Sequence, residues 1–414
     1  MKKVFLFGAM LCMLVACNGK NGNGVTQPKK LKLNSTEKEL VNHCNDFSFN
    51  LLAQVASDDE NENVVLSPLS ASMLLGMLMN GADGETLAQM QAVTGFGSDV
   101  AIEDINAYYR QLIDVLPALD KYTNVNLANG IWAHEKFPVR ETFVEACKKN
   151  FDAEAKNVPT FMDDKVLEEI NKYAAKHTNN RIKKVIDKSM VSDATVMALL
   201  NALYFKSEWA QKFKKSDTKK QSFTTLNGKK IQTDMMYNGA EWNYGRGEDY
   251  QLVELPYQGD AYCADIILPA EGIDIRTWTK SLNAERWQEM VDRIYSTEVT
   301  LLMPKFSLNY RRSLAGDLQA LGITDAFDEQ QANFSRLSEM RTFINLFLQY
   351  TFMQVDEEGT EAAAVTVATM DLTTAASLPK QLTIDRPFLF VIREREYGTI
   401  LFTALIGHPE WQKQ

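Results

Sequence analysis

The stretch that decides the fold is Val355-Asp-Glu-Glu-Gly-Thr-Glu-Ala-Ala-Ala-Val-Thr-Val-Ala-Thr369. It alternates with a period of two, as a β-strand does. One face carries only small, uncharged side chains, namely Thr360, Ala362, Ala364, Thr366 and Ala368. The segment that follows, up to the apolar run at Phe388, is polar, rich in Thr and without helical periodicity. The pattern therefore predicts a strand-forming segment that leads into an exposed loop.

Four segments resemble motifs of the serpin family, and they occur in the family's order. Glu357-Glu-Gly-Thr-Glu-Ala-Ala-Ala364 resembles the hinge of inhibitory serpins. The others are Asn63-Val-Val-Leu-Ser-Pro-Leu-Ser70 with Gly81-Ala-Asp-Gly-Glu-Thr86, Asn201-Ala-Leu-Tyr-Phe-Lys-Ser-Glu-Trp209, and Met303-Pro-Lys305. The resemblance extends over residues 35–409. It implies an α+β serpin fold with three β-sheets, eight or nine helices and an exposed reactive-centre loop.

Length and composition favour one large domain. The chain has 414 residues, of which 45% are hydrophobic, and we find no internal linker and no repeat. We therefore expect a single serpin domain over residues 35–411. The net charge of −10 argues against nucleic-acid binding, which depends on Lys and Arg neutralising phosphates.

The N-terminus has the pattern of an export signal. Met1-Lys-Lys3 and the apolar run that follows predict a signal peptide over residues 1–16, too short to span a bilayer. Leu14-Val-Ala-Cys17 resembles a bacterial lipobox, which predicts lipidation at Cys17 and a flexible tether over residues 17–34. The alternative is a plain signal peptide. The prediction is an exported lipoprotein anchored to a membrane, at the outer membrane or the cell surface.

Cysteines and histidines give no sign of a disulfide framework, a metal site or a cofactor. Cys44, Cys147 and Cys263 are odd in number and widely spaced, so we expect buried, unpaired thiols. Four histidines are scattered without a ligand motif. No nucleophile elbow and no phosphate-binding loop occurs, so the sequence does not favour an enzyme.

Local patterns predict several elements. Thr36 and Glu39 fit a capping box before a long helix, and Ser67-Pro68 fits the start of a second helix that ends before Gly81. Strands are predicted at residues 251–256, 297–303, 388–392 and 399–405, the last two as a hairpin around Gly398.

The resemblance assigns roles to individual residues. The hinge comprises Glu357, Glu358, Gly359, Thr360, Glu361, Ala362, Ala363 and Ala364. A polar cluster beneath the main sheet, called the shutter, comprises Ser67, Ser70, Asn201 and Gln349, where Gln349 replaces a histidine that many serpins have. The breach, where insertion begins, comprises Trp209, Lys305 and Glu357.

The position of the cleaved bond stays open. Counting from the hinge glycine gives Thr373-Thr374, whereas counting back from Pro387 gives Ala376-Ser377. Ala368-Thr369, Met370-Asp371 and Leu372-Thr373 are alternatives, and Val367 bounds the range in which we expect cleavage. No Arg or Lys lies between Gly359 and Pro379, which disfavours trypsin-like proteases because their S1 pocket needs a cation.

The resemblance implies a suicide-substrate inhibitor. A protease attacks the loop, forms an acyl-enzyme, and is trapped when the cut loop inserts into the main sheet. We expect elastase-like or chymotrypsin-like serine proteases as partners, with cysteine proteases as a further class, and a monomeric inhibitor. Heparin is not expected, because the region from Glu85 to Tyr109 lacks the basic helix of heparin-activated serpins. The alternative is a non-inhibitory serpin that acts as a binding or chaperone-like module.

Overall fold

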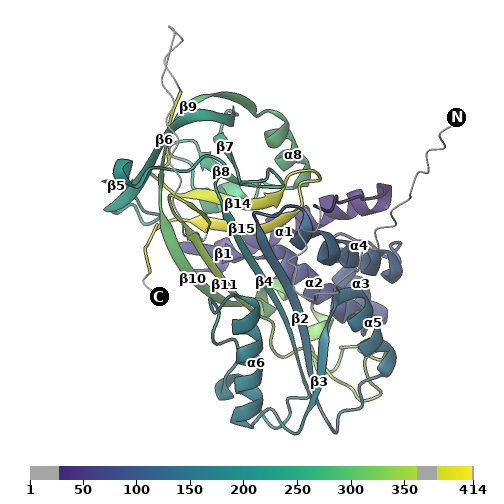
Figure 1. Cartoon of the computed structure of the whole chain (residues 1–414). Helices are drawn as coiled ribbons and strands as arrows, with labels where there is room; N and C mark the ends of the chain where they lie inside the picture. Colours follow the sequence, from purple (N-terminus) through teal and green to yellow (C-terminus); the bar gives the residue numbers. More distant parts are fainter. Residues whose placement is uncertain (1–27, 361–379, 413–414) are drawn as a thin grey trace, which may run out of the picture.

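The computed structural model describes residues 28–360 and 380–412 (Figure 1). Within these residues, helices and strands alternate irregularly, as an α+β chain predicts. The α-helices are α1 (Ser35–Asp58), α2 (Pro68–Met79), α3 (Gly84–Val93), α4 (Ile102–Val115), α5 (Glu141–Phe151), α6 (Asp164–His177), α7 (Ile275–Thr279), α8 (Ala284–Asp292) and α9 (Ala315–Leu321). Short 3-10 helices are η1 (Leu116–Ala118), η2 (Lys188–Met190), η3 (Lys215–Asp217) and η4 (Asp325–Phe327).

The strands form two hydrogen-bonded sheets. The nine-stranded sheet has the order β1-β15-β14-β8-β7-β6-β9-β13, with β5 paired to β6, and the six-stranded sheet has the order β10-β11-β12-β4-β2-β3. The strands are β1 (Asn63–Leu66), β2 (Asn124–His134), β3 (Glu154–Val158), β4 (Met197–Glu208), β5 (Lys219–Thr224), β6 (Lys230–Arg246), β7 (Tyr250–Pro256), β8 (Tyr262–Pro269), β9 (Tyr295–Pro304), β10 (Phe306–Ser313), β11 (Leu348–Val355), β12 (Gly359–Thr360), β13 (Lys380–Thr383), β14 (Phe388–Glu394) and β15 (Ile400–Ile406).

The expected three sheets are therefore joined into two by hydrogen bonding. The reason is the length of β6, which has 17 residues. Its residues 230–235 pair with β5, residues 235–244 pair with β9, and residues 243–246 pair with β7. One long strand thus connects what the resemblance predicts as two separate sheets.

Helix α2 lies at the centre of the molecule. All of its residues are buried, and it packs against β15 of one sheet and β4 of the other. An apolar helix without a polar face has to be covered on all sides. Ser67 caps it by accepting a hydrogen bond from the Ser70 backbone, with Pro68 in the first turn, so this helix begins as predicted.

The capping box of α1 differs from the predicted one. Asn34 accepts from the Glu37 backbone at 2.9 Å, while the Glu37 carboxylate accepts from the Asn34 backbone at 2.8 Å. The prediction of Thr36 and Glu39 was wrong by two residues, because the same spacing of polar groups occurs twice in this segment.

Part of the predicted tether is packed on the body. Leu31 and Leu33 are buried, and the Lys29 backbone donates to the Ala118 carbonyl at 2.8 Å. Lys32 donates through its backbone to the Gln111 side chain at 3.3 Å. Two leucines in a polar segment carry enough apolar surface to hold it against α4 and η1. Residues 28–34 therefore belong to the folded domain, which corrects the predicted boundary at residue 35.

The predicted strands are confirmed within two residues at each end, as β7, β9, β14 and β15. The hairpin of β14 and β15 turns at Gly398, whose φ of +79° suits glycine. Cys44, Cys147 and Cys263 are free and buried, as expected.

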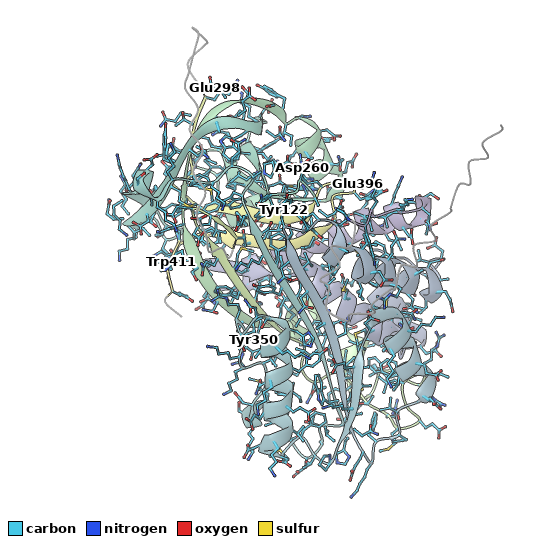
Figure 2. All side chains as sticks on the ribbon, viewed as in Figure 1. Tyr122, Asp260, Glu298, Tyr350, Glu396 and Trp411 are labelled. Carbon is cyan, nitrogen blue, oxygen red and sulfur yellow. The ribbon has the colours of Figure 1, made fainter. Side chains whose placement is uncertain are left out.

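Helix α6 covers one face of the six-stranded sheet. Val166, Leu167 and Ile170 of α6 form an apolar cluster with Trp132 of β2, and Tyr350 of β11 packs against this cluster. Figure 2 shows Tyr350 beside α6. The helix therefore bridges β2 and β11, which lie on opposite sides of β4.

Candidate functional site

The six-stranded sheet is open between β4 and β11. The only described strand between them is the two-residue β12, which pairs Thr360 with Ser207 of β4 and with Val355 of β11. Beyond β12, β4 pairs only with β2, and β11 pairs only with β10, among the described residues. We call this gap between β4 and β11, from β12 to the start of β4 at Met197, the slot.

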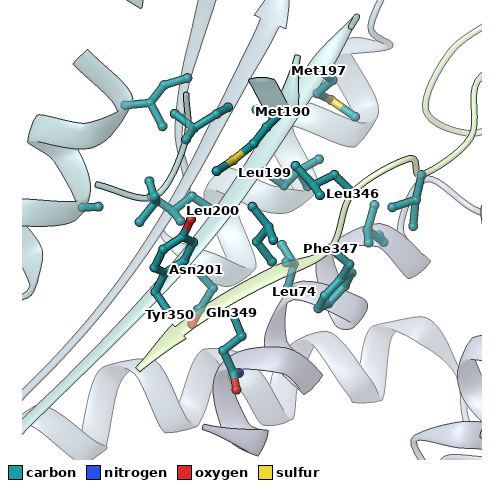
Figure 3. Close-up of a pocket in the computed structure, with 18 of the residues that line it drawn as sticks. Leu74, Met190, Met197, Leu199, Leu200, Asn201, Leu346, Phe347, Gln349 and Tyr350 are labelled. Atoms are coloured by element: carbon teal, nitrogen blue, oxygen red, sulfur yellow. The ribbon is translucent and has the colours of Figure 1, made fainter. Parts of the chain in front are cut away.

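The slot contains a cavity of about 230 Å³. Figure 3 shows Leu199, Leu200 and Asn201 of β4 on one side and Leu346, Gln349 and Tyr350 on the other. A second cavity of about 20 Å³ continues along the slot as far as Thr360. The main cavity exceeds the space that one water needs many times over, so the sheet is not closed here.

Burial along β4 follows the slot. Its residues Ala202 to Phe205 are buried, whereas Met197 to Asn201 are only half-buried, although β4 lies between other strands. Ile170 and Ala174 of α6 line the cavity on one face of the sheet, and Leu74 of α2 lines it on the other. The part of β4 from Met197 to Asn201 therefore has no described neighbouring strand on the side that faces β11.

A chain of hydrogen bonds runs beneath the slot. The Gln349 side chain accepts from the Ser67 backbone at 3.1 Å and donates to the Ser67 carbonyl at 2.8 Å. The Ser67 hydroxyl donates to the Leu401 carbonyl of β15 at 3.1 Å. Gln349 therefore ties β11 to the start of α2 with one donor and one acceptor, as an amide can.

The chain continues from α2 to β4 and β2. Ser70 donates its hydroxyl proton to Asn201, whose side chain donates to Asn129 of β2 at 2.7 Å. Asn129 in turn donates to the Phe151 carbonyl of α5 at 2.7 Å. The four predicted shutter residues thus lie in one network. Asn129 was missed, although an asparagine within the apolar strand at residues 125–133 is a signal that could have found it.

Gly359 lies where no side chain fits. A Cβ placed there would be 2.2 Å from the Ser207 carbonyl oxygen and 2.7 Å from the Glu208 Cα. Both atoms belong to the backbone of β4 and cannot move aside without breaking the pairing of β12. A glycine is therefore required for the chain to enter the slot at this point.

Thr360 is the first residue inside the slot. It is buried, and its hydroxyl shares a 2.6 Å hydrogen bond with the Tyr257 hydroxyl. The Tyr257 ring stacks on Trp209 with ring centroids 4.6 Å apart. The Trp209 indole donates to the Asp356 carbonyl at 2.9 Å, and its backbone donates to the Glu358 carbonyl at 2.8 Å. Trp209 thus holds the turn that leads to Gly359.

Three lysines hold the two glutamates before Gly359. Lys305 pairs with Glu357 at 3.3 Å, and the Thr218 hydroxyl donates to the same carboxylate at 2.8 Å. Lys212 and Lys215 pair with Glu358 at 3.1 and 3.2 Å. Burial alone raises the pKa of Glu358, but the two lysines outweigh it, so its pKa lies below the ordinary value.

Trp209, Lys305 and Glu357, the three predicted breach residues, therefore lie within this one cluster. Tyr257, Thr218, Lys212 and Lys215 were missed. Nothing in their local sequence distinguishes them, because their role depends on contacts with residues more than 100 positions away.

Several predicted residues lie outside the described residues. They are the hinge residues Glu361, Ala362, Ala363 and Ala364, the candidate cleavage positions from Val367 to Ser377 including Thr373 and Thr374, and the candidate lipidation site Cys17.

One buried cluster has side chains spaced as in a metal site, but its carboxylates are already paired with arginines. Ligand atoms of Glu254, Cys263 and Asp265 lie within 4.8 Å of one another. Arg393 donates to Glu254 at 2.5 Å and to Asp265 at 2.6 Å, and Arg395 also pairs with Glu254. Two guanidinium groups thus neutralise the two carboxylates.

Among residues 28–360 and 380–412, no helix is both long and apolar enough to cross a bilayer.

The family model for serpins, described as serine protease inhibitors, matches residues 42–409. Human neuroserpin is 31% identical over 374 residues, which cover 88% of this chain and 90% of that protein. An uncharacterised serpin-like protein of Methanosarcina mazei is 29% identical over 424 residues, covering 99% of this chain and 98% of that protein.

Solved structures agree with the sequence matches. The native-state structure of tengpin, a thermophilic serpin, superposes with a TM-score of 0.81 at 30% identity, covering 92% of this chain and 96% of tengpin. Human thyroxine-binding globulin in complex with thyroxine has a TM-score of 0.82 at 24% identity, covering 91% of this chain and all of that one, and shows the fold alone. With the family model spanning nearly the whole folded domain, the chain belongs to the serpin family.

Proposed function

We propose that this chain is a suicide-substrate inhibitor of serine proteases. The observation that supports this most directly is the slot, a strand position in the middle of a sheet that the described residues fill only at β12. A protease that cuts the loop releases its amino-terminal part from Lys380, so that this part is free to enter the slot. The protease carries out the attack on the peptide bond and forms the acyl-enzyme. The inhibitor contributes the insertion of the cut loop into the sheet.

The register at β12 specifies which residues would enter. If the strand continues from the pairing of Thr360 with Ser207, Ala362 pairs with Phe205, Ala364 with Leu203, and Met370 with Met197 at the start of β4. Thr360 points inward to Tyr257, so every second residue after it also points inward. These residues are the small, uncharged face of the sequence motif, which suits the apolar slot.

This register also ranks the candidate bonds. Filling β4 to its first residue requires the strand to extend to Met370. A cut at Thr373-Thr374 or Ala376-Ser377 supplies this length. A cut at Ala368-Thr369 leaves the lowest positions unfilled, so we expect fewer proteases to be trapped there.

The target class follows from the loop's residues. Small and medium apolar residues around these bonds favour elastase-like and chymotrypsin-like serine proteases, and cysteine proteases are a further class to test. We propose that heparin is not a cofactor, since Arg110 of α4 is paired with both Asp114 and Asp152. The inhibitor is proposed to act as a monomer.

Export and anchoring form a separate part of the proposal. The signal at residues 1–16 and the lipobox at Cys17 support a bacterial lipoprotein held at the outer membrane or cell surface. Metabolic labelling with a palmitate analogue tests it: wild type should incorporate label and Cys17→Ser should not. Equal labelling of the two would rule out lipidation at Cys17.

The second candidate function is a non-inhibitory serpin. Thyroxine-binding globulin, whose structure contains thyroxine, is a binding protein by name and a structural neighbour of this chain. The hinge favours inhibition over this alternative, because Thr360, Ala362 and Ala364 are small and uncharged, and the one charge, at Glu361, falls on the other face of the period-two pattern.

One experiment distinguishes the two functions. The chain is mixed with pancreatic elastase, and the products are separated in SDS with and without prior inactivation of the elastase active-site serine. An inhibitor gives an SDS-stable adduct only with active enzyme. Complete cleavage without any adduct, with elastase, chymotrypsin and a cysteine protease alike, would favour the non-inhibitory function.

Mass spectrometry of the C-terminal peptide released with each protease then locates the bond. We expect cuts between residues 367 and 377, at different bonds for proteases with different pockets. A cut outside this range would contradict the placement of the loop.

A further inference from the structure

A group of exposed lysines lies on the hairpin of β5 and β6 and on the segment directly before it, which includes η3. Residues 214–230 contain six lysines and a single acidic residue, Asp217, within a chain whose net charge is −10. We call these six the lysine face, and all of them are exposed: Lys214, Lys215, Lys219, Lys220, Lys229 and Lys230. In the antiparallel register Thr224 lies opposite Lys230, so Lys220 and Lys230 share one side of the hairpin, while Lys219 lies on the other side.

Most of this charge is unpaired. Lys220 pairs with Asp234 at 3.1 Å, and Lys215 pairs with Glu358 at 3.2 Å. The other four lysines have no acidic partner among the described residues. Like charges held close together repel each other, so the face carries a positive potential that an acidic partner would relieve.

The lysine face adjoins both attachment points of the loop. Thr218, directly before β5, donates to Glu357 at the base of the hinge. At the other end, β6 pairs with β9, and β9 pairs with β13, which begins at Lys380. Figure 1 shows β5, β6 and β9 together at one end of the molecule. A protease that holds the loop in its active site therefore has this face beside it.

The position of the N-terminus argues against a membrane as the partner. Lys29 is bound to Ala118 of η1 and, through its side chain, to the Asp114 carbonyl of α4. Figure 1 shows α4 on the opposite side of the molecule from β5. A lipid anchor that leaves the body beside α4 would direct the lysine face away from the bilayer.

We propose that the lysine face is a docking surface for an acidic patch beside the active site of the target protease. This rests on the proposed inhibitory function and specifies the partner further. Docking accelerates encounter by electrostatic steering, without touching the bait residues, so it selects among proteases with the same S1 preference. The effect is strongest at low ionic strength.

The test compares three forms of the full chain. The face variant changes Lys214, Lys219, Lys229 and Lys230 to Gln, leaving the paired Lys215 and Lys220 intact. The control variant makes the same charge change with four exposed lysines at the far end of the molecule: Lys148, Lys149, Lys165 and Lys183. The probes are pancreatic elastase and the same enzyme with succinylated surface amines, which is more acidic but keeps its S1 pocket. Equal melting temperatures check that both variants fold.

The measured quantity is the second-order rate constant of adduct formation, at about 50 mM and about 500 mM salt. With succinylated elastase at low salt, we expect the face variant to be about tenfold slower than wild type and the control variant to match wild type. The difference should disappear at high salt. The number of inhibitor molecules consumed per protease should stay unchanged, because the loop is intact.

Other outcomes overturn the proposal. Equal rates for wild type and face variant with the acidic elastase would show that the face does not dock a protease. Binding to phosphatidylserine vesicles or to heparin that only the face variant loses, with unchanged protease rates, would assign the face to that ligand instead. If wild type forms no adduct with either elastase, the proposed function itself fails, and the gel shows this directly.

Discussion

The two sheets of this serpin differ in how completely they are paired. In the nine-stranded sheet, β14 lies between β15 and β8, β15 lies between β1 and β14, and all residues of β14 and β15 are buried. In the six-stranded sheet, β4 and β11 face each other across the slot, and β12 is the only described strand between them. Strands β14 and β15 thus have a partner on each side, whereas most of β4 and β11 has a described partner on one side only.

The difference indicates that the fold could gain stability at the slot, if a further strand paired with β4 and β11 there. Backbone groups along the slot can each gain a hydrogen bond when a strand enters, at about 0.5–1.5 kcal/mol per bond. The predictions below change the slot while leaving the nine-stranded sheet intact.

The largest effect should come from cutting the loop. A strand that runs from Thr360 to Met370 would bond to both β4 and β11, which together is worth roughly 5–15 kcal/mol. We expect cleaved protein to melt about 6–20 °C above intact protein in a calorimetric scan. A melting curve unchanged by cleavage would mean that the slot stays empty.

The second prediction concerns Thr360→Arg. A guanidinium in this buried position would lie next to Tyr257 without an acidic partner. Such an uncompensated buried charge destabilises the folded state by about 3–5 kcal/mol. We expect the fraction of elastase trapped to fall at least about tenfold, with the loop still cleaved. Thr360→Ser keeps the hydroxyl and is the matched control. The role assigned to Thr360 fails if the two variants trap elastase equally well.

The third prediction concerns the network beneath the slot. Asn201→Ala removes the bond to Asn129 and leaves the Ser70 hydroxyl without its acceptor, at a cost of about 1–3 kcal/mol. We expect a lower free energy of unfolding in urea. Asn227→Ala, in the exposed turn between β5 and β6, is the control and should leave stability unchanged. Equal free energies of unfolding for the two variants would show that the network does not stabilise the fold.

The smallest effect should come from the ion pairs at Glu358. Its pKa is below the ordinary value of 4.5, so folding favours the ionised form. The stabilisation is present above that value and is lost as the pH falls below it. Replacing Lys212 and Lys215 by Gln should cost about 1 kcal/mol at pH 7, measured by urea unfolding. The difference from wild type should shrink as the pH is lowered below 4.5, and a difference independent of pH would contradict the assignment.

Sequence patterns predicted the elements well where local signals are strong. Ser67-Pro68 and the apolar run after it define α2 without any tertiary information. The capping box of α1 was misplaced because two overlapping segments offer the same polar spacing, and only packing chooses between them. The burial of Leu31 and Leu33 also depends on α4 and η1, which the local sequence does not reveal.

The site was predictable only through the family resemblance. Gly359 could be named from its motif, but the reason for it is the Ser207 carbonyl, about 150 residues away in sequence. Asn129, Tyr257 and Thr218 were missed because their contacts are with residues from elements that are distant in sequence. Helices and strands have periodic local patterns that a sequence reveals, whereas a single polar contact between distant elements has no such pattern.

The packing of residues 28–34 also sets the reach of the protein. If Cys17 carries a lipid as proposed, only residues 18–27 separate the bilayer from the folded body. Ten residues span at most about 35 Å at full extension. The domain is then confined to a thin layer above the membrane, with its α4 side turned inward. If the proposed inhibition and anchoring both hold, such a molecule would act on proteases that come within a few nanometres of the membrane and not on those in the surrounding fluid.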